Sequence, residues 1–335
     1  MTRIGLVGAG LVGRRHLEAL ARMPGLTLSA VLDPALTQDE PLPQVQTLEE
    51  LIAQSDGIIL ATPNHLHRPM AEEVLRAGLP VLVEKPLADT AGNARAIAEV
   101  SASTGTPVLV GHHRRHNPIV AKAKQIVDSA ALGAITTVHG NCWLPKPDSY
   151  YAQGWRQGAG AGPLFINLIH DVDVLMYLCG PITHVQAMEA KTQRQSQAEE
   201  VVAATLCFAS GALGTLNLSD TALGPWSWEL TAGENAAYPK TDQSSYLIGG
   251  THGSLALPNL TLWSQENGPD WWAPISATRY PVDTVDTLVA QLDHFGEVIA
   301  GKTAPRVSAE DGLRAVAVIE AIKTAAHTGQ SVAIA

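Results

Sequence analysis

The chain has 335 residues, of which 46% are hydrophobic and 16% are charged, and its formal net charge is −10. This composition predicts a globular protein with a sizeable core, and the length suits about two domains. The charge argues against nucleic acid or an anionic membrane as a partner, and no apolar run reaches the roughly 18–20 residues of a membrane helix. The first residues lead directly into an expected strand, and the three cysteines are isolated. We therefore expect a cytoplasmic protein without a secretory signal.

The N-terminal segment has the pattern of a dinucleotide-binding site. A short expected strand is followed by a G-x-G-x-x-G loop and then by an expected helix. Gly8 allows the tight turn, Gly10 lets the backbone approach a pyrophosphate, and Gly13 permits close packing of helix on strand. The helix start offers free N–H groups and a favourable dipole to phosphates. The residues predicted to bind the cofactor here are Gly8, Gly10, Leu11, Val12 and Gly13.

Asp33 ends the second expected strand, about 20 residues after Gly13. A carboxylate at this place receives the hydroxyls of the adenosine ribose and repels a 2′-phosphate, so NAD is favoured over NADP. The alternative is that Asp33 and Pro34 only form a turn.

Strands and helices alternate through the first third of the chain. A Pro-rich segment at residues 41–45 replaces a full crossover helix. The alternation predicts an α/β Rossmann domain with a doubly wound parallel sheet. Expected strands cover residues 3–7, 28–33, 57–61, 81–83 and 107–110, and expected helices cover 14–21, 88–104, a segment starting at Thr47 and a segment ending at Ala77.

The pattern of expected secondary structure changes after residue 118. One expected helix runs to Ala131, and mostly strands follow it. This predicts an α+β C-terminal domain with a large, mostly antiparallel open sheet. We therefore predict an NAD-binding domain at 1–118 and a substrate-binding and oligomerisation domain at 119–335. Expected strands cover 135–143, 184–190, 201–208, 212–219, 226–231 and the surroundings of Tyr246 and Leu255, and expected helices cover 284–299 and 308–327.

Val81-Leu82-Val83 reads as a buried strand that runs into Glu84-Lys85-Pro86. Charges at the end of a buried strand are costly unless water, a partner or a ligand meets them. In open α/β sheets, ligands bind outside the carboxyl ends of the strands. The alternative is a Glu-Lys pair on the surface.

Residues 164–175 read as a mostly apolar helix that carries Asn167, His170, Asp171 and Asp173. Asn167 and His170 are three residues apart, so an α-helix places them on one face. The sequence thus suggests His170 as a catalytic residue, with a core histidine as the alternative. Asp173 lies off that face and is expected to be structural.

The glycine loop, Asp33, Thr62-Pro63-Asn64-x-x-His67 and Glu84-Lys85-Pro86 occur together in this order. With Gly158-x-Gly160-x-Gly162 before the His170 helix, the chain resembles the Gfo/Idh/MocA family. The resemblance implies a Rossmann domain that binds NAD(P), a C-terminal sheet that builds a dimer or tetramer, and oxidation of a secondary alcohol on a sugar, cyclitol or related ring.

The resemblance also implies roles for individual residues. Lys85 would hold the reacting hydroxyl beside the nicotinamide, Glu84 would touch the nicotinamide ribose or hold Lys85, and His170 would be the general base. Histidine titrates near the working pH and an ammonium stabilises a developing alkoxide, which suits these roles. Further cofactor contacts are expected from Thr62, Pro63, Asn64 and His67.

The chain departs from the family at Ile166, where many members carry an Asp one turn before the histidine. The missing charge favours an anionic substrate, and Arg can grip a carboxylate bidentately. Aromatic faces suit a sugar or a cyclic diene, although Trp226 and Trp228 are expected to alternate on one strand as sheet core or interface. The predicted substrate contacts are Asn167, Arg115, Arg156, Lys146 and Trp155.

Together these features predict NAD-dependent oxidation of a ring hydroxyl on a sugar, sugar acid, cyclitol or carboxylated cyclic diol. One alternative is a non-catalytic NAD(P)-binding sensor, and another is an enzyme that retains NAD for lyase or glycosidase chemistry. The expected partners are a small polyol or hydroxy acid and other copies of the chain, as a homodimer or homotetramer. No metal is predicted, because neither histidine cluster, at 65–67 or at 112–116, has helical i, i+4 ligand spacing with a carboxylate general base between the ligands.

Overall fold

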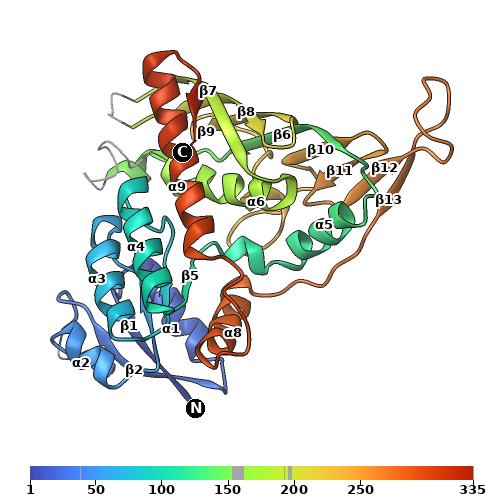
Figure 1. The fold of residues 1–335 in the computed structure, drawn as a ribbon. Helices are drawn as coiled ribbons and strands as arrows, with labels where there is room; N and C mark the ends of the chain where they lie inside the picture. Colours follow the sequence, from blue (N-terminus) through green and yellow to red (C-terminus); the bar gives the residue numbers. More distant parts are fainter. Residues whose placement is uncertain (38, 153–161, 192, 195–197, 335) are drawn as a thin grey trace. The chain divides into compact units, whose positions relative to one another are not determined.

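The computed structural model describes residues 1–37, 39–152, 162–191, 193–194 and 198–334 (Figure 1). They fall into two compact units, and the first consists of Met1–His116 and Asp286–Val316. The second consists of Asn117–Val285 and Ala317–Ala335. The division into domains at residue 118 stays a prediction, and residues 286–316 group with the N-terminal segment.

A parallel sheet forms the centre of the first unit, as predicted. Its strands are β1 (Thr2–Val7), β2 (Leu26–Leu32), β3 (Gly57–Leu60), β4 (Val81–Val83) and β5 (Val108–Val110). Their order is β2-β1-β3-β4-β5. The chain moves from β1 towards one edge and from β3 towards the other, so right-handed crossovers place helices on both faces. The helices of this unit are α1 (Leu11–Leu20), α2 (Leu48–Ala53), α3 (Asn64–Arg76), α4 (Ala91–Thr104), η1 (His113–His116) and α8 (Thr287–Ile299).

Both faces of this sheet are buried. The consecutive residues Ile58 and Ile59 point to opposite faces, and neither is exposed. Phe295 of α8 is also fully buried and belongs to the same core. Residues 43–45 run beside β2 instead of forming a helix, with Val31 N donating to Pro43 O at 2.8 Å. This agrees with the crossover expected from the Pro-rich segment.

The second unit is built on a nine-stranded sheet. Its order is β13-β12-β11-β10-β6-β9-β8-β7-β14, and every neighbouring pair except β6 and β9 is antiparallel. The predicted α+β domain with a large, mostly antiparallel sheet is therefore confirmed. The strands are β6 (Ile135–Trp143), β7 (Ile182–Ala190), β8 (Val201–Phe208), β9 (Leu213–Ser219), β10 (Tyr246–Gly250), β11 (Gly253–Leu257), β12 (Thr261–Ser264), β13 (Ser276–Arg279) and β14 (Val332–Ala333).

Helices cover one face of this sheet. A Cβ on Gly140 of β6 would lie 3.6 Å from Leu175, which shows how closely the covering helix approaches. The opposite face carries apolar side chains that are exposed in the single chain, among them Met188 at 77%, Leu213 at 60% and Leu247 at 50%. The helices of this unit are α5 (Pro118–Asp128), η2 (Asp148–Ala152), the π-helical turn η4 (Leu164–Leu168), α6 (Ile169–Cys179) and α7 (Trp228–Thr231), and α9 (Ala309–Thr328) runs from the first unit into the second.

The single parallel pair brings two distant segments together. β6 and β9 pair from Thr137↔Leu213 to Trp143↔Ser219, so both strands end at the same edge. The chain continues this pairing beyond the strands, because Lys146 N donates to Asp220 O at 3.0 Å.

One predicted strand is wrong. Residues 226–231 do not form a strand, because Ser227 caps the short helix α7 and its Oγ accepts from Leu230 N at 3.3 Å. Trp226 and Trp228 therefore do not share a sheet face. Trp228 is buried and stacks on Tyr246 at 5.8 Å, whereas Trp226 is partly exposed and meets Trp143 edge-on.

Candidate active site

The glycine loop lies between β1 and α1, at the carboxyl end of the parallel sheet. Gly8 has a φ of +88°, and a Cβ there would lie 2.5 Å from Ala61 O. A Cβ on Gly13 would lie 1.9 Å from Gly8 O, so helix and loop touch as the motif requires. A Cβ on Gly10, in contrast, would meet no atom within 4 Å. The backbone at Gly10 is thus open to a pyrophosphate, and the residues present fit a dinucleotide.

The first turn of α1 adds to this fit. No side chain caps the helix at Gly10, so its first N–H groups are free for an anion. Leu11 is 78% exposed and Val12 is 40% exposed. Large apolar side chains exposed beside a glycine loop are well placed to contact a bound cofactor.

Asp33 lies beside the same loop. Its Oδ2 accepts from Ala9 N at 2.6 Å and its Oδ1 accepts from Ala35 N at 2.8 Å. These bonds fix the carboxylate at the end of β2. Nearby on α1, Arg14 pairs with Glu40 at 3.0 Å. The contact of Asp33 with a ribose stays a prediction.

His67 connects two backbone segments of the predicted cofactor site. The residue is fully buried in α3, which begins at Asn64 directly after Pro63. Its ring nitrogens lie 2.9 Å from the carbonyl oxygens of Thr62 and Pro86. Burial lowers the pKa of His67 despite these two carbonyls. The ring thus ties the start of α3 to the turn after Lys85, and its direct contact with the cofactor stays a prediction.

Glu84 follows β4 and is almost buried, with 13% of its side chain exposed. His16 Nε2 donates to its Oε1 at 2.8 Å, and Lys85 N donates to its Oε2 at 3.1 Å. Burial raises the pKa of Glu84, but the hydrogen bond and charge of His16 and the nearby Lys85 outweigh it and lower the pKa to about 2. The carboxylate is therefore an anion held from two sides. The Lys85–Pro86 peptide bond is cis.

A buried cluster of basic side chains lies in η1 and directly before it. Its members are His112, Arg114, Arg115 and His116. Burial, followed by the charges of Lys85 and Arg115, lowers the pKa of His112 well below its usual value. Burial also lowers the pKa of His116 to about 2. The predicted substrate residue Arg115 is 4% exposed, and its Nη2 lies 3.6 Å from Asp311 Oδ1. Arg115 is thus placed in this cluster beside a carboxylate of the same unit.

In the second unit, His170 is the second residue of α6 and is 5% exposed. The helix begins with the π turn η4, a feature that is frequent at functional sites. Asn167 lies in this turn and is 9% exposed, and no described group donates to its Oδ1. Asp171 accepts a hydrogen bond from the Tyr246 hydroxyl, which anchors α6 to the sheet.

Lys146 follows β6 and has 8% of its side chain exposed. Its Nζ lies 4.0 Å from Asp220 Oδ2 and 5.1 Å from the centre of the Tyr150 ring. Asp220 already accepts from the Tyr151 hydroxyl and, at 2.8 Å, from Arg194. Within the described residues the Lys146 ammonium has no hydrogen-bond partner, and burial lowers its pKa despite Asp220.

Two predicted substrate residues, Trp155 and Arg156, lie outside the described residues, as do Gly158 and Gly160 of the glycine-rich segment. Lys85 and Arg115 belong to the first unit, whereas Lys146, Asn167 and His170 belong to the second.

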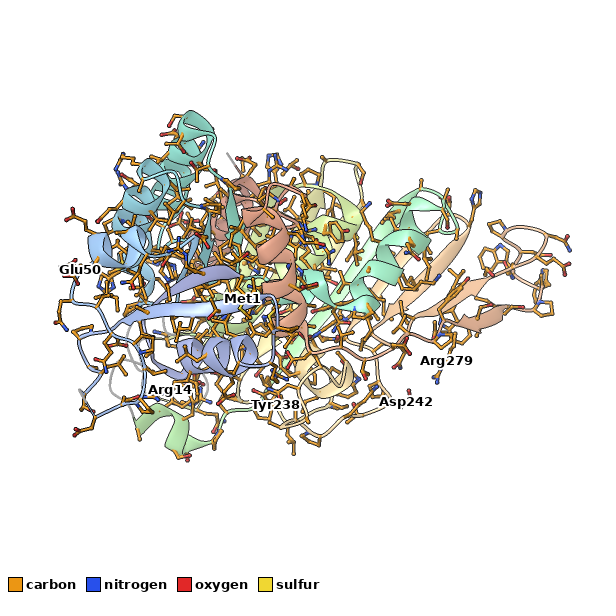
Figure 2. The ribbon with its side chains drawn as sticks, turned by 90° about the horizontal axis from the view of Figure 1, so that it is seen from below. Met1, Arg14, Glu50, Tyr238, Asp242 and Arg279 are labelled. Carbon is orange, nitrogen blue, oxygen red and sulfur yellow. The ribbon has the colours of Figure 1, made fainter. Side chains whose placement is uncertain are left out.

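The second unit contains a cavity of about 470 Å³. Arg279 and Asp242 lie on its rim with their charged groups 3.6 Å apart, and Figure 2 shows the two side chains next to each other. Other lining residues are Thr231, Glu234, Lys240 and Tyr280. Part of this lining comes from residues 233–242, which lie between α7 and β10.

Sequence reasoning missed three residues that complete these sites. His16 lies three residues after Gly13 on α1 but contacts Glu84, 68 residues away. Asp220, directly after β9, lies beside Lys146, and Arg194, from the segment between β7 and β8, pairs with Asp220. The one usable signal was the spacing of His16 from the glycine loop, which places it on the buried side of the helix.

Neither a metal site nor a membrane helix is found in the part of the chain that the structure describes. No group of three or more His, Cys, Asp or Glu side chains there could hold a metal ion. None of its helices has the length and apolar character needed to cross a membrane.

Residues 2–112 match the profile described as "Oxidoreductase family, NAD-binding Rossmann fold", and residues 120–256 match "GFO/IDH/MocA C-terminal domain". Inositol 2-dehydrogenase from Corynebacterium glutamicum is 29% identical over 205 residues, which cover 58% of each chain and thus less than two thirds of that relative. A 4-carboxy-2-hydroxymuconate-6-semialdehyde dehydrogenase from Sphingobium sp. is 28% identical over 67% of this chain and 73% of its own.

Among solved structures, the WlbA dehydrogenase from Bordetella pertussis, in complex with NADH and UDP-GlcNAcA, has a TM-score of 0.78. It is 24% identical over 100% of this chain and 99% of its own. At this identity the likeness concerns the fold.

Proposed function

Because the chain belongs to the Gfo/Idh/MocA family of oxidoreductases, we propose that it is an NAD-dependent dehydrogenase of a secondary ring hydroxyl. The substrate class comprises sugars, sugar acids, cyclitols and carboxylated cyclic diols. The observation that carries the proposal is the glycine loop, where Gly10 is open to a pyrophosphate and leads into the uncapped start of α1. The inositol 2-dehydrogenase is consistent with this class of reaction, and the semialdehyde dehydrogenase is consistent with dehydrogenation more generally.

Three residues of this chain carry the proposed chemistry. His170 accepts the proton of the reacting hydroxyl. Lys85 holds that hydroxyl and stabilises the negative charge that develops on its oxygen. Glu84, fixed by His16 and by Lys85 N, orients Lys85 and receives the nicotinamide ribose. When bound, NAD supplies the acceptor for the hydride.

We propose NAD rather than NADP as the cofactor. The Asp33 carboxylate lies beside the glycine loop, and the guanidinium of Arg14 is already paired with the Glu40 carboxylate. Both features disfavour an additional 2′-phosphate, because a phosphate needs a free cation and no neighbouring carboxylate.

We further propose that the preferred ring carries a carboxylate. Ile166 removes the usual acidic side chain from the helix, and Lys146 is a buried cation whose hydrogen bonds no described residue accepts. The Sphingobium relative is named for a carboxylated substrate. A carboxylate would give Lys146 a charge-assisted hydrogen bond, which is stronger than one between neutral groups.

The exposed face of the nine-stranded sheet supports a homodimer or homotetramer, because Met188, Leu213 and Leu247 are apolar and exposed there. Location in the cytoplasm stays a prediction.

NADH formation tests the proposed activity. Purified protein is incubated with NAD and with pairs of substrates that differ in one group, such as D-glucose and D-glucuronate or a neutral cyclitol and its carboxylated counterpart. We expect NADH with at least one polyol and faster turnover of the acidic partner. Absence of NADH formation with every polyol contradicts a dehydrogenase, and an NAD that remains bound through purification would then favour the lyase or glycosidase alternative.

A further inference from the structure

His16 enters the proposed chemistry only through its contact with Glu84, and what that contact does to Glu84 is not yet explained. It lies on α1, the helix whose first turn follows the glycine loop, and its side chain is fully buried. Its Nε2 points at Glu84 Oε1 at 2.8 Å. A carboxylate only accepts hydrogen bonds, so Nε2 must carry the proton. One helix thus supplies both the cofactor loop and a donor to the residue before Lys85.

The surroundings of Glu84 leave little freedom for its side chain. A Cβ on Gly111 would lie 2.9 Å from Glu84 Oε2, so only a glycine leaves room there. The second oxygen accepts from the backbone N–H of Lys85. The carboxylate therefore lies between Gly111, which follows β5, and α1, and His16 donates a hydrogen bond to its other oxygen.

The charged and titratable groups facing Glu84 come from several elements. His16 belongs to α1, His67 to α3, Lys85 follows β4, and His112 and His113 follow β5. Burial is the largest influence on the pKa of Glu84 and raises it, whereas the hydrogen bond from His16 is the largest influence that lowers it. Without that donor, burial has more weight and the carboxyl becomes easier to protonate.

We propose that His16 is a positioning residue, which holds the Glu84 carboxylate in place and thereby sets the geometry of Lys85 next to the cofactor loop. The proposal rests on the proposed function in one respect, namely that Glu84 faces the nicotinamide ribose. It predicts a role that a packing residue does not have, because His16 then controls the protonation of a different side chain.

Three substitutions separate positioning from packing. In His16→Gln, the amide nitrogen reaches about as far as Nε2 and can donate to Glu84 Oε1. His16→Asn is its matched control, because its shorter side chain places the amide nitrogen near the Nδ1 position and out of reach of Glu84. His16→Leu fills the buried space without a donor. A packing role predicts that stability alone changes, and that all three variants keep Glu84 ionised.

The experiment measures the protonation of Glu84 directly in the full-length protein without cofactor. Side-chain carboxyl ¹³C shifts of labelled glutamate are followed from pH 8 to pH 4, and Glu84→Gln in the same background identifies the resonance. We expect Glu84 to stay ionised in wild type and His16→Gln, and to take up a proton within this range in His16→Asn and His16→Leu. If Glu84 stays ionised in all variants, the inference is overturned, whether or not the protein is a dehydrogenase.

A second measurement tests the consequence at the cofactor site. NAD⁺ affinity is determined by calorimetry at pH 8 and pH 5 for the same proteins. A protonated Glu84 no longer offers an anion, so we expect the affinity of His16→Leu to fall about tenfold or more between the two pH values, with a smaller change for wild type and His16→Gln. Equal pH dependence in wild type and His16→Leu would overturn this role at the cofactor site. If Glu84 takes up a proton in His16→Leu but the wild-type protein forms no NADH, the inference about His16 holds and the proposed activity is refuted.

Discussion

Glu84 in the first unit and Lys146 in the second are both charged side chains that follow a strand, and both are largely buried. Each oxygen of Glu84 accepts a hydrogen bond, one from His16 and one from Lys85 N. Lys146 has Asp220 at 4.0 Å, but no described residue accepts a hydrogen bond from its Nζ. A buried charge is costly unless it is paired and hydrogen-bonded, so the two sites differ in how far the protein itself compensates the charge.

The difference suggests two kinds of site. Both oxygens of Glu84 accept hydrogen bonds, as is expected where a cofactor must be held in one geometry. Lys146 Nζ and Asn167 Oδ1 have no hydrogen-bond partner among the described residues, and in the proposed function the substrate supplies one. Stability given up in this way can be recovered as affinity when a ligand supplies the missing hydrogen-bond partner, an acceptor for Lys146 and a donor for Asn167.

The largest expected effect concerns the two residues that are proposed to act on the reacting hydroxyl, His170 and Lys85. We expect His170→Ala and Lys85→Ala to lower kcat by about 10²–10⁴-fold, because each removes a group that acts in the transition state. Steady-state NADH formation measures the effect, and His327→Ala is a control because His327 is exposed on α9. Both variants retaining nearly wild-type kcat would show that the roles are wrongly assigned.

The next prediction concerns stability and pH at the complete site. The pKa of Glu84 is about 2 in the folded protein, below the ordinary value of 4.5 for a glutamate, so ionised Glu84 favours folding. This contribution is present above about pH 4.5 and is lost as the pH falls towards 2. Its size is about 3 kcal/mol. Urea unfolding at pH 5 and pH 3 should show a larger loss of unfolding free energy for wild type than for Glu84→Gln, and equal losses would contradict the prediction.

At the incomplete site, Lys146→Met removes the charge and keeps an apolar side chain of similar length. We expect the affinity for the carboxylated substrate to fall about 10–100-fold, with little change for its neutral counterpart. The melting temperature of the free protein should stay the same or rise, because an incompletely compensated buried charge is lost. Lys302→Met, at an exposed lysine, is the control. A marked drop in melting temperature would mean that Lys146 is a structural partner of Asp220.

The smallest expected effect concerns Asp33. In Asp33→Asn one side-chain oxygen can still accept a backbone hydrogen bond, but the negative charge is gone. We expect the preference for NAD over NADP to fall about tenfold. The ratio of kcat/KM for the two cofactors measures it, and an unchanged ratio would mean that Asp33 only fixes the turn.

The sequence predicted what local patterns determine. The glycine loop, the alternation of strands and helices and the charges after β4 are signals within a few residues, and the parallel sheet follows from them. Helix α7 shows where local patterns fail. The alternating tryptophans favoured a strand, but the Ser227 hydroxyl caps a helix there.

The polar partners of the site could not be predicted in the same way. The contact of His16 with Glu84 depends on how α1 packs on the sheet, and 68 residues separate the two in the chain. The burial of Lys146 depends on β9, which lies more than sixty residues further along. The pattern of charge and hydrophobicity along a sequence does not predict which distant carboxylate will pair with a given lysine in the fold.

The parallel pairing of β6 with β9 also has a consequence for the order of folding. Thr137 pairs with Leu213, so this contact closes a loop of about 76 residues, whereas β8 and β9 are joined by a short turn. Contacts that close long loops cost more chain entropy and tend to form late. The edge that holds Lys146 and Asp220 is therefore expected to assemble after the β7–β8–β9 hairpins. Newly made chains would acquire this part of the candidate substrate site as one of their last steps.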